Sequence, residues 1–61
     1  MRRDVKVSFA DGTALQIEGV KGYCVGDKQY AGTYMVEKNG HIIYLNQSEV
    51  RYIGYTEDIE G

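Results

Sequence analysis

The chain of 61 residues is long enough for one domain, and its net charge of −2 lacks the basic excess typical of proteins that live on nucleic acid or anionic membranes. Its single cysteine excludes a disulfide within the chain, and one cysteine with one histidine are too few for a protein-made zinc site. A domain this small has a thin margin of stability, so we expect either unusually good packing or stabilisation by association with another chain.

No apolar run reaches the length of a signal-peptide core or a membrane-spanning helix. With only one thiol in the chain, the composition predicts a cytoplasmic protein that makes no contact with a membrane. Eight glycines, six tyrosines and no proline favour a compact β domain with tight turns.

The N-terminal part of the chain predicts a hairpin around residues 10–12. The runs on both sides of this turn alternate polar and apolar side chains, which is the period of a half-buried strand. A three-residue loop sets Val7 opposite Leu15 and Val5 opposite Ile17, whereas a two-residue loop would mix apolar with polar partners. We therefore predict the longer loop, with its glycine at the left-handed position of a G1 bulge.

The central part of the chain predicts a second hairpin at Asn39-Gly40. Both central residues of a type I′ turn need a positive φ, and asparagine and glycine adopt it most readily. The flanking runs are rich in β-branched and aromatic residues. A two-residue turn at this point pairs Val36 with Ile43 and Met35 with Tyr44.

The remaining elements are a short strand at 23–25, a loop, a long strand from Tyr30 to Lys38, and a final strand that ends at Tyr55. Within the long strand, Gly32 either lies opposite Tyr23 or marks a bend. Asn46 is a capping residue for a single 3₁₀ turn before that last strand. Residues 56–61 are expected to form a frayed acidic tail. The sequence thus predicts one all-β domain over residues 1–61, either a small antiparallel sheet or a partly open barrel of about five or six short strands.

A helical turn directly before the final strand resembles the element order of SH3-like and Sm-like small barrels. This resemblance covers most of the chain, but it lies in element order alone and implies no functional residues. In size and general character the chain is also similar to short proteins encoded by bacteriophages and mobile elements. This resemblance implies the hypothesis that the chain inhibits a host protein. The last strand is apolar on both faces, so it could close a barrel or pair across a subunit interface.

The predicted registers divide the strands between a core face and an opposite face. The expected core face holds Tyr23, Val25, Tyr30, Tyr34, Val36, Ile43 and Leu45. On the opposite face, Met35, Ile42 and Tyr44 break the polar pattern. Three explanations are open: the strands bend between two halves of a small barrel or coiled sheet, the N-terminal hairpin folds over these residues, or they form an exposed patch for self-association or a partner. The candidate contact residues are Met35, Ile42, Tyr44 and Tyr52, with Arg51 at the rim.

No arrangement of residues predicts catalysis. We interpret His41 as a solvated turn residue and Cys24 as a buried small hydrophobic side chain, and we expect no enzyme activity, no cofactor and no metal. The expected function is a non-enzymatic protein-binding module that forms a dimer or larger homo-oligomer, or that binds another, unidentified protein. The alternative is a small barrel that binds single-stranded nucleic acid, with bases stacked on exposed tyrosines beside scattered basic residues.

Overall fold

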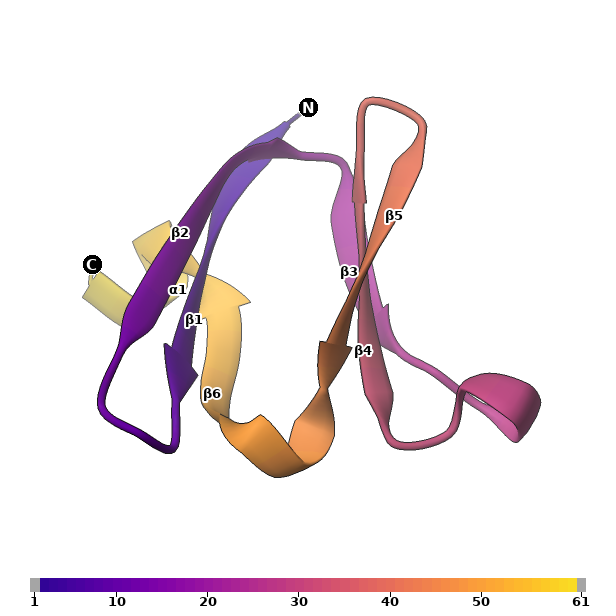
Figure 1. Ribbon diagram of the computed structural model, residues 1–61. Coiled ribbons are helices and arrows are strands. Elements are labelled where there is room, and N and C mark those ends of the chain that lie inside the picture. The colour runs from indigo at the N-terminus through magenta and orange to yellow at the C-terminus, as the bar shows by residue number, and fades with distance from the viewer. Residues whose placement is uncertain (1, 61) are drawn as a thin grey trace.

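The computed structural model describes the backbone of residues 2–60, and it consists mainly of two three-stranded antiparallel sheets that face each other (Figure 1). Sheet A has the strand order β2-β1-β6 and sheet B has the order β3-β4-β5. These sheets confirm the predicted all-β domain. The strands are β1 (Arg3–Phe9), β2 (Ala14–Val20), β3 (Gly22–Val25), β4 (Thr33–Lys38), β5 (His41–Asn46) and β6 (Val50–Tyr55), and the helical elements are the 3₁₀ turns η1 (Lys28–Tyr30) and η2 (Gln47–Glu49) and the helix α1 (Thr56–Glu60).

The first hairpin has the predicted register. Val5 lies opposite Ile17 and Val7 lies opposite Leu15. Gly12 has a φ of 92°, the left-handed conformation that the G1 bulge requires. This register turns the apolar residues of β1 and β2 toward sheet B.

The second hairpin is confirmed as well. Asn39 and Gly40 have φ angles of 52° and 77°, as a type I′ turn requires. Met35 lies opposite Tyr44, and Val36 lies opposite Ile43. The two strands of this hairpin form the middle and one side of sheet B.

The connection between β3 and β4 differs from the prediction. The expected long strand from Tyr30 begins only at Thr33, because residues 28–30 form η1 and Gly32 bends the chain at a φ of 87°. Of the two roles expected for Gly32, the bend is the one observed, and Tyr23 lies opposite Val36 rather than Gly32. The register is displaced by an even number of residues, so the inner and outer faces of β4 are those that the sequence predicts.

The last strand pairs with the first within the same chain and is an outer strand of sheet A, so among the described residues it does not close a barrel. Val7 of β1 lies opposite Ile53 of β6. A single residue, Lys21, connects β2 to β3, and η2 leads the chain back from sheet B to sheet A (Figure 1). The side chain of Asn46 accepts a hydrogen bond from the Ser48 N–H and so caps η2, as predicted.

The core between the sheets is small. Its buried side chains are Val5, Val7, Ile17, Val20 and Val36. Half-buried aromatic and aliphatic residues surround them, including Tyr23, Ile43, Leu45 and Tyr55. Two residues expected on the core face are exposed instead: Val25 lies at the end of the short outer strand β3, and Tyr30 lies in η1, outside β4.

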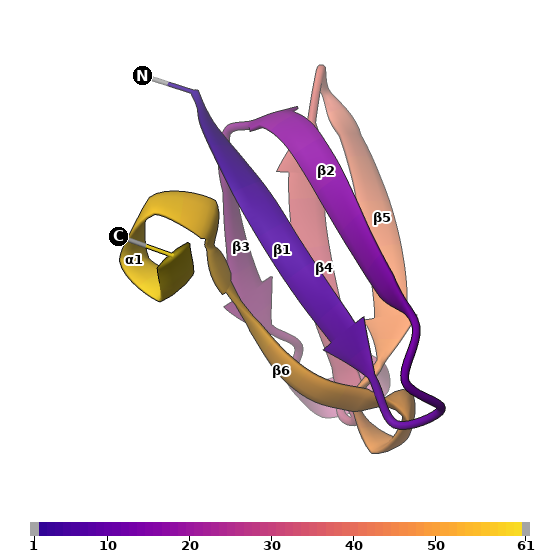
Figure 2. The same ribbon diagram turned by 90° about the vertical axis from the view of Figure 1, so that its left-hand side faces the viewer.

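The acidic C-terminal segment is helical through residue 60, where the sequence predicted a frayed tail. Arg3 of β1 forms ion pairs with Glu57 and Asp58 on α1. Ile59 packs against β6, where a Cβ built on Gly54 would lie 3.1 Å from the Ile59 Cδ1 atom. Figure 2 shows α1 beside sheet A, next to the end of β6. Residue 61 lies outside the described part of the chain.

Candidate interaction surface

The outer face of sheet B is the largely apolar surface formed by Cys24, Met35, Ile42 and Tyr44. Met35 lies opposite both Cys24 and Tyr44 in adjacent strands, so the three side chains are neighbours across the sheet. The core occupies the other side of the sheet, where Val36 is fully buried. Ile42 is 40% exposed and Tyr44 is 50% exposed. The N-terminal hairpin therefore does not cover these residues, and this alternative from the sequence analysis is wrong.

Cys24 belongs to this outer face, and the prediction that it is a buried hydrophobic residue is wrong. The reason is the alternation of side chains along β3. Because Tyr23 packs toward the core, its neighbour Cys24 points the opposite way. The same alternation could have placed Cys24 correctly from the sequence.

Tyr30 extends the outer face of sheet B by packing against Tyr44. The two rings are stacked, with centroids 5.4 Å apart and an interplanar angle of 16°. Reduced solvation of the phenol and a hydrogen bond with Tyr30 raise the pKa of Tyr44, so the uncharged form is favoured. Sequence analysis missed this contact because it placed Tyr30 in β4 rather than in η1.

A shallow depression lies on the outer face of sheet B, with polar groups at its margin. The Lys21 ammonium lies 3.7 Å from a carboxylate oxygen of Glu37, whose strand also carries Met35. An apolar centre with a polar margin is the usual anatomy of a protein–protein contact. The depression is lined by Gly22, Tyr23, Cys24, Met35, Glu37 and Ile42.

The structure does not bring all five predicted contact residues together. Met35, Ile42 and Tyr44 share the outer face of sheet B, whereas Tyr52 lies on sheet A opposite Ser8. Tyr52 is 44% exposed on the side of that sheet away from the core. Arg51 is also exposed, at a register shift where β1 and β6 pair irregularly. The predicted single surface is therefore two separate surfaces, one on each sheet.

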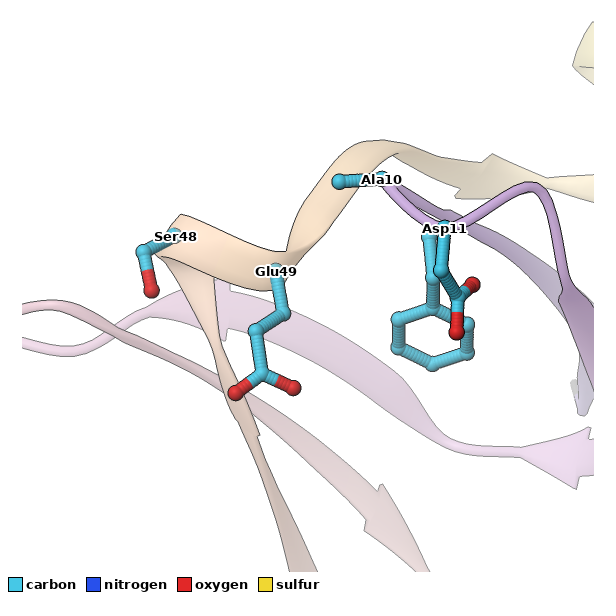
Figure 3. Close-up of a pocket in the computed structure, with 5 residues that line it drawn as sticks. Ala10, Asp11, Ser48 and Glu49 are labelled. Atoms are coloured by element: carbon cyan, nitrogen blue, oxygen red, sulfur yellow. The ribbon is translucent and has the colours of Figure 1, made fainter.

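A second depression lies at the end of the molecule where the β1–β2 turn approaches η2 (Figure 3). It is lined by Phe9, Ala10, Asp11, Ser48 and Glu49, so two carboxylates lie on its rim. The Asp11 Oδ1 atom accepts hydrogen bonds from the Thr13 hydroxyl at 2.6 Å and the Thr13 N–H at 2.9 Å. These bonds lower the pKa of Asp11. The Asp11 carboxylate thus holds the turn, and this end of the molecule is acidic.

The described residues contain no group of three or more His, Cys, Asp and Glu side chains arranged to hold a metal ion. His41 is exposed beside the turn, where the sequence placed it. Among the same residues, no helix has the length and apolar character needed to cross a membrane. Comparison with known proteins finds no matching family model, no similar curated protein and no similar solved structure.

Proposed function

We propose that this chain is a non-enzymatic protein-binding module and that it binds through the outer face of sheet B. The observation that carries the proposal is the exposure of Ile42 and Tyr44 in a sheet whose other side holds the core. Apolar patches of this kind on a small protein mark interaction sites. Met35 and the tyrosines are also residue types that are enriched at protein contacts.

The size of the core supports self-association as the mode of binding. Four valines and one isoleucine are the buried hydrophobic residues of the described chain, and every fully buried side chain is a valine. Small domains with so little buried volume commonly gain stability from a partner subunit. We accordingly propose a homo-oligomer. A phage or mobile-element inhibitor of a host protein, the finer hypothesis from the sequence, would use the same surface.

Single-stranded nucleic acid is the alternative ligand. It is supported by the exposed rings of Tyr30, Tyr44 and Tyr52 and by the exposed Arg51 next to Tyr52. This alternative predicts that a short oligonucleotide binds at low salt and that its affinity falls steeply as salt is added. Absence of binding at low salt would remove it.

The proposal is tested by the solution mass of the wild type, Ile42→Glu and Tyr52→Glu, measured by light scattering over a range of concentrations. Tyr52→Glu is the matched control, because Tyr52 and Ile42 are similarly exposed but lie on different sheets. We expect a wild-type dimer or larger, loss of association in Ile42→Glu, and an unchanged mass in Tyr52→Glu.

If the wild type is a monomer, the outer face of sheet B is either open for a different protein or needed for folding. The free energy of unfolding of the wild type and of Ile42→Glu separates these two cases. If the wild type is a monomer and Ile42→Glu leaves its stability unchanged, the outer face of sheet B is open for a different protein, and the proposal stands. If Ile42→Glu unfolds the monomer or leaves an oligomer intact, the proposed binding surface is wrong.

A further inference from the structure

The backbone of β5 has a regular pattern of free hydrogen-bonding groups. A two-residue turn makes its flanking residues, Lys38 and His41, a hydrogen-bonded pair. Alternation along the ladder then bonds Ile43 to β4 and turns the N–H and C=O groups of Ile42 and Tyr44 away from it. The alternation continues one residue past the end of β5. There the Gln47 N–H donates a hydrogen bond to the Gly32 carbonyl oxygen at 2.9 Å, as expected for the next hydrogen-bonded pair.

The free side of β5 lacks the features that protect sheet edges from pairing. Among the described residues, β5 ends its sheet, with β4 on one side and no strand on the other (Figures 1 and 2). It is six residues long and contains no Lys, Arg, Asp, Glu, Pro or Gly, and its register with β4 is unbroken. Such a strand is a template for pairing with another chain.

The other outer strands are protected. The ladder of β6 with β1 shifts register, and α1 packs against β6 through Ile59. β3 is only four residues long and begins with Gly22. β2 carries the exposed Glu18, and its register with β1 is also broken. Short length, charge, bulges and a covering helix are the ordinary means of blocking an edge, so β5 is the edge that stands open.

We infer that a second copy of this chain pairs with β5 in antiparallel orientation, about a two-fold axis at Ile43. The inference rests on the proposed function, because it names the partner and the contact of the outer face of sheet B. In this register Ile42 and Tyr44 exchange their outward backbone hydrogen bonds with Tyr44 and Ile42 of the second copy. Their side chains then meet as pairs of an aromatic and a β-branched residue, a favourable cross-strand combination. An axis at Tyr44 would instead set Ile42 opposite Asn46.

Charges at the two ends of β5 favour the same orientation. The hairpin end carries Lys38, and the other end leads through η2 to the exposed Glu49, which shares the acidic depression with Asp11 (Figure 3). Antiparallel pairing sets the Lys38 end of one copy beside the Glu49 end of the other. Parallel pairing would bring like charges together. The charge pattern of the strand ends is therefore self-complementary in the antiparallel arrangement.

The inference is tested by amide hydrogen exchange, measured for each residue by NMR. The measurement is made at protein concentrations above and below the one at which light scattering shows the monomer becoming a dimer. We expect the amides of Ile42 and Tyr44 to exchange roughly tenfold or more slowly at the higher concentration. The Ile43 amide serves as the internal control, because its bond to β4 protects it in the single chain as well. A dimer in which the Ile42 and Tyr44 amides stay fast would overturn edge pairing and leave the proposed binding surface intact.

Two variants separate the backbone contact from the side-chain contact. Ile42→Pro removes an N–H that β4 does not use, so we expect a folded monomer. Ile42→Ala keeps that N–H, and we expect it to remain a dimer with weaker association. A dimeric Ile42→Pro, or a wild type that is monomeric at every concentration, would overturn the inference. If Ile42→Pro does not fold, the exchange measurement on the wild type decides alone.

Discussion

The guanidinium carbon of Arg3 lies 3.6 Å from the centroid of the Tyr55 ring, so a cation–π contact joins the N-terminal end of β1 to the C-terminal end of β6. The same guanidinium forms ion pairs with Glu57 and Asp58, the latter at 3.1 Å. Tyr55 also packs against Tyr23 of sheet B, with ring centroids 5.1 Å apart. Arg3 therefore connects α1 to the aromatic contact between the two sheets.

We predict that Arg3→Ala lowers the midpoint of thermal unfolding and releases α1 from sheet A. Arg3→Lys should restore only part of the loss, since an ammonium lacks the planar donor fork. The measurement is thermal denaturation at low and high salt, where the difference from wild type should shrink but persist, because salt screens the ion pairs more than the ring contact. Arg2→Ala, at the exposed neighbouring residue, is the control. Equal midpoints for the two alanine variants would contradict the role given to Arg3.

A matched pair of valines tests the core. Val36 is fully buried, and among the described residues it is the member of the buried core that comes from sheet B. Val25, also in sheet B, is 63% exposed. Val36→Ala should cost about 2 kcal/mol of unfolding free energy, from lost burial and the cavity left behind. Val25→Ala should change it by less than about 0.5 kcal/mol. Urea denaturation of both variants measures the difference, and similar losses would mean that the inner face of sheet B has been assigned incorrectly.

The Asp11 carboxylate makes the stability that the β1–β2 turn gives to the folded state depend on pH. The Thr13 hydroxyl and N–H lower the pKa of Asp11 in the folded chain, so ionised Asp11 stabilises the folded state at pH values above its ordinary pKa of about 4. This contribution is lost as the pH falls through the lowered pKa. Asp11→Asn should therefore be less stable than wild type at neutral pH, and the gap should close in acid. A gap that does not change with pH would contradict this assignment.

The exposure of Cys24 is directly measurable. We expect a water-soluble thiol reagent to label Cys24 completely in the folded protein, at a rate within about tenfold of the rate in denaturant. Cys24 lies on β3, at the edge of sheet B farthest from β5, so pairing through the β5 edge predicts that labelling also proceeds at high protein concentration, whereas a dimer that covers the outer face of sheet B would slow it. Labelling that requires denaturant would restore the interpretation of Cys24 as a core residue.

Local chemistry made both hairpins predictable. The Asn39-Gly40 turn and the glycine of the first loop need positive φ angles, and each turn fixes the register of the strands that it joins. Side-chain alternation then assigns Met35, Ile42 and Tyr44 to one face of sheet B. These features depend on residues close together in sequence, which is why the sequence alone was sufficient.

Several features that were not predicted depend on contacts that strand patterns do not report, some of them between distant segments. η1 is compact because Gly26 lies so close to it that a Cβ there would be 2.4 Å from the Tyr30 carbonyl oxygen. No periodic pattern reports such an approach, and the start of β4 was therefore misplaced. The helical turn at residues 56–60 is held by Arg3 at the other end of the chain. Tyr52 was grouped with Tyr44 because nothing local shows that their strands belong to different sheets.

The pairing of β1 with β6 also determines the order in which the chain can fold. A tight hairpin such as β4–β5 forms within about 1–10 μs from neighbouring residues, whereas β1 gains its second partner only after the whole chain has been brought together. During synthesis the first strand must therefore wait for the last one to be made. The open edge of β5 is present from the time that residues 41–46 are made, before β6 pairs with β1 and completes sheet A. Pairing of this edge between chains that are still incomplete is thus a hazard to which this topology exposes the protein.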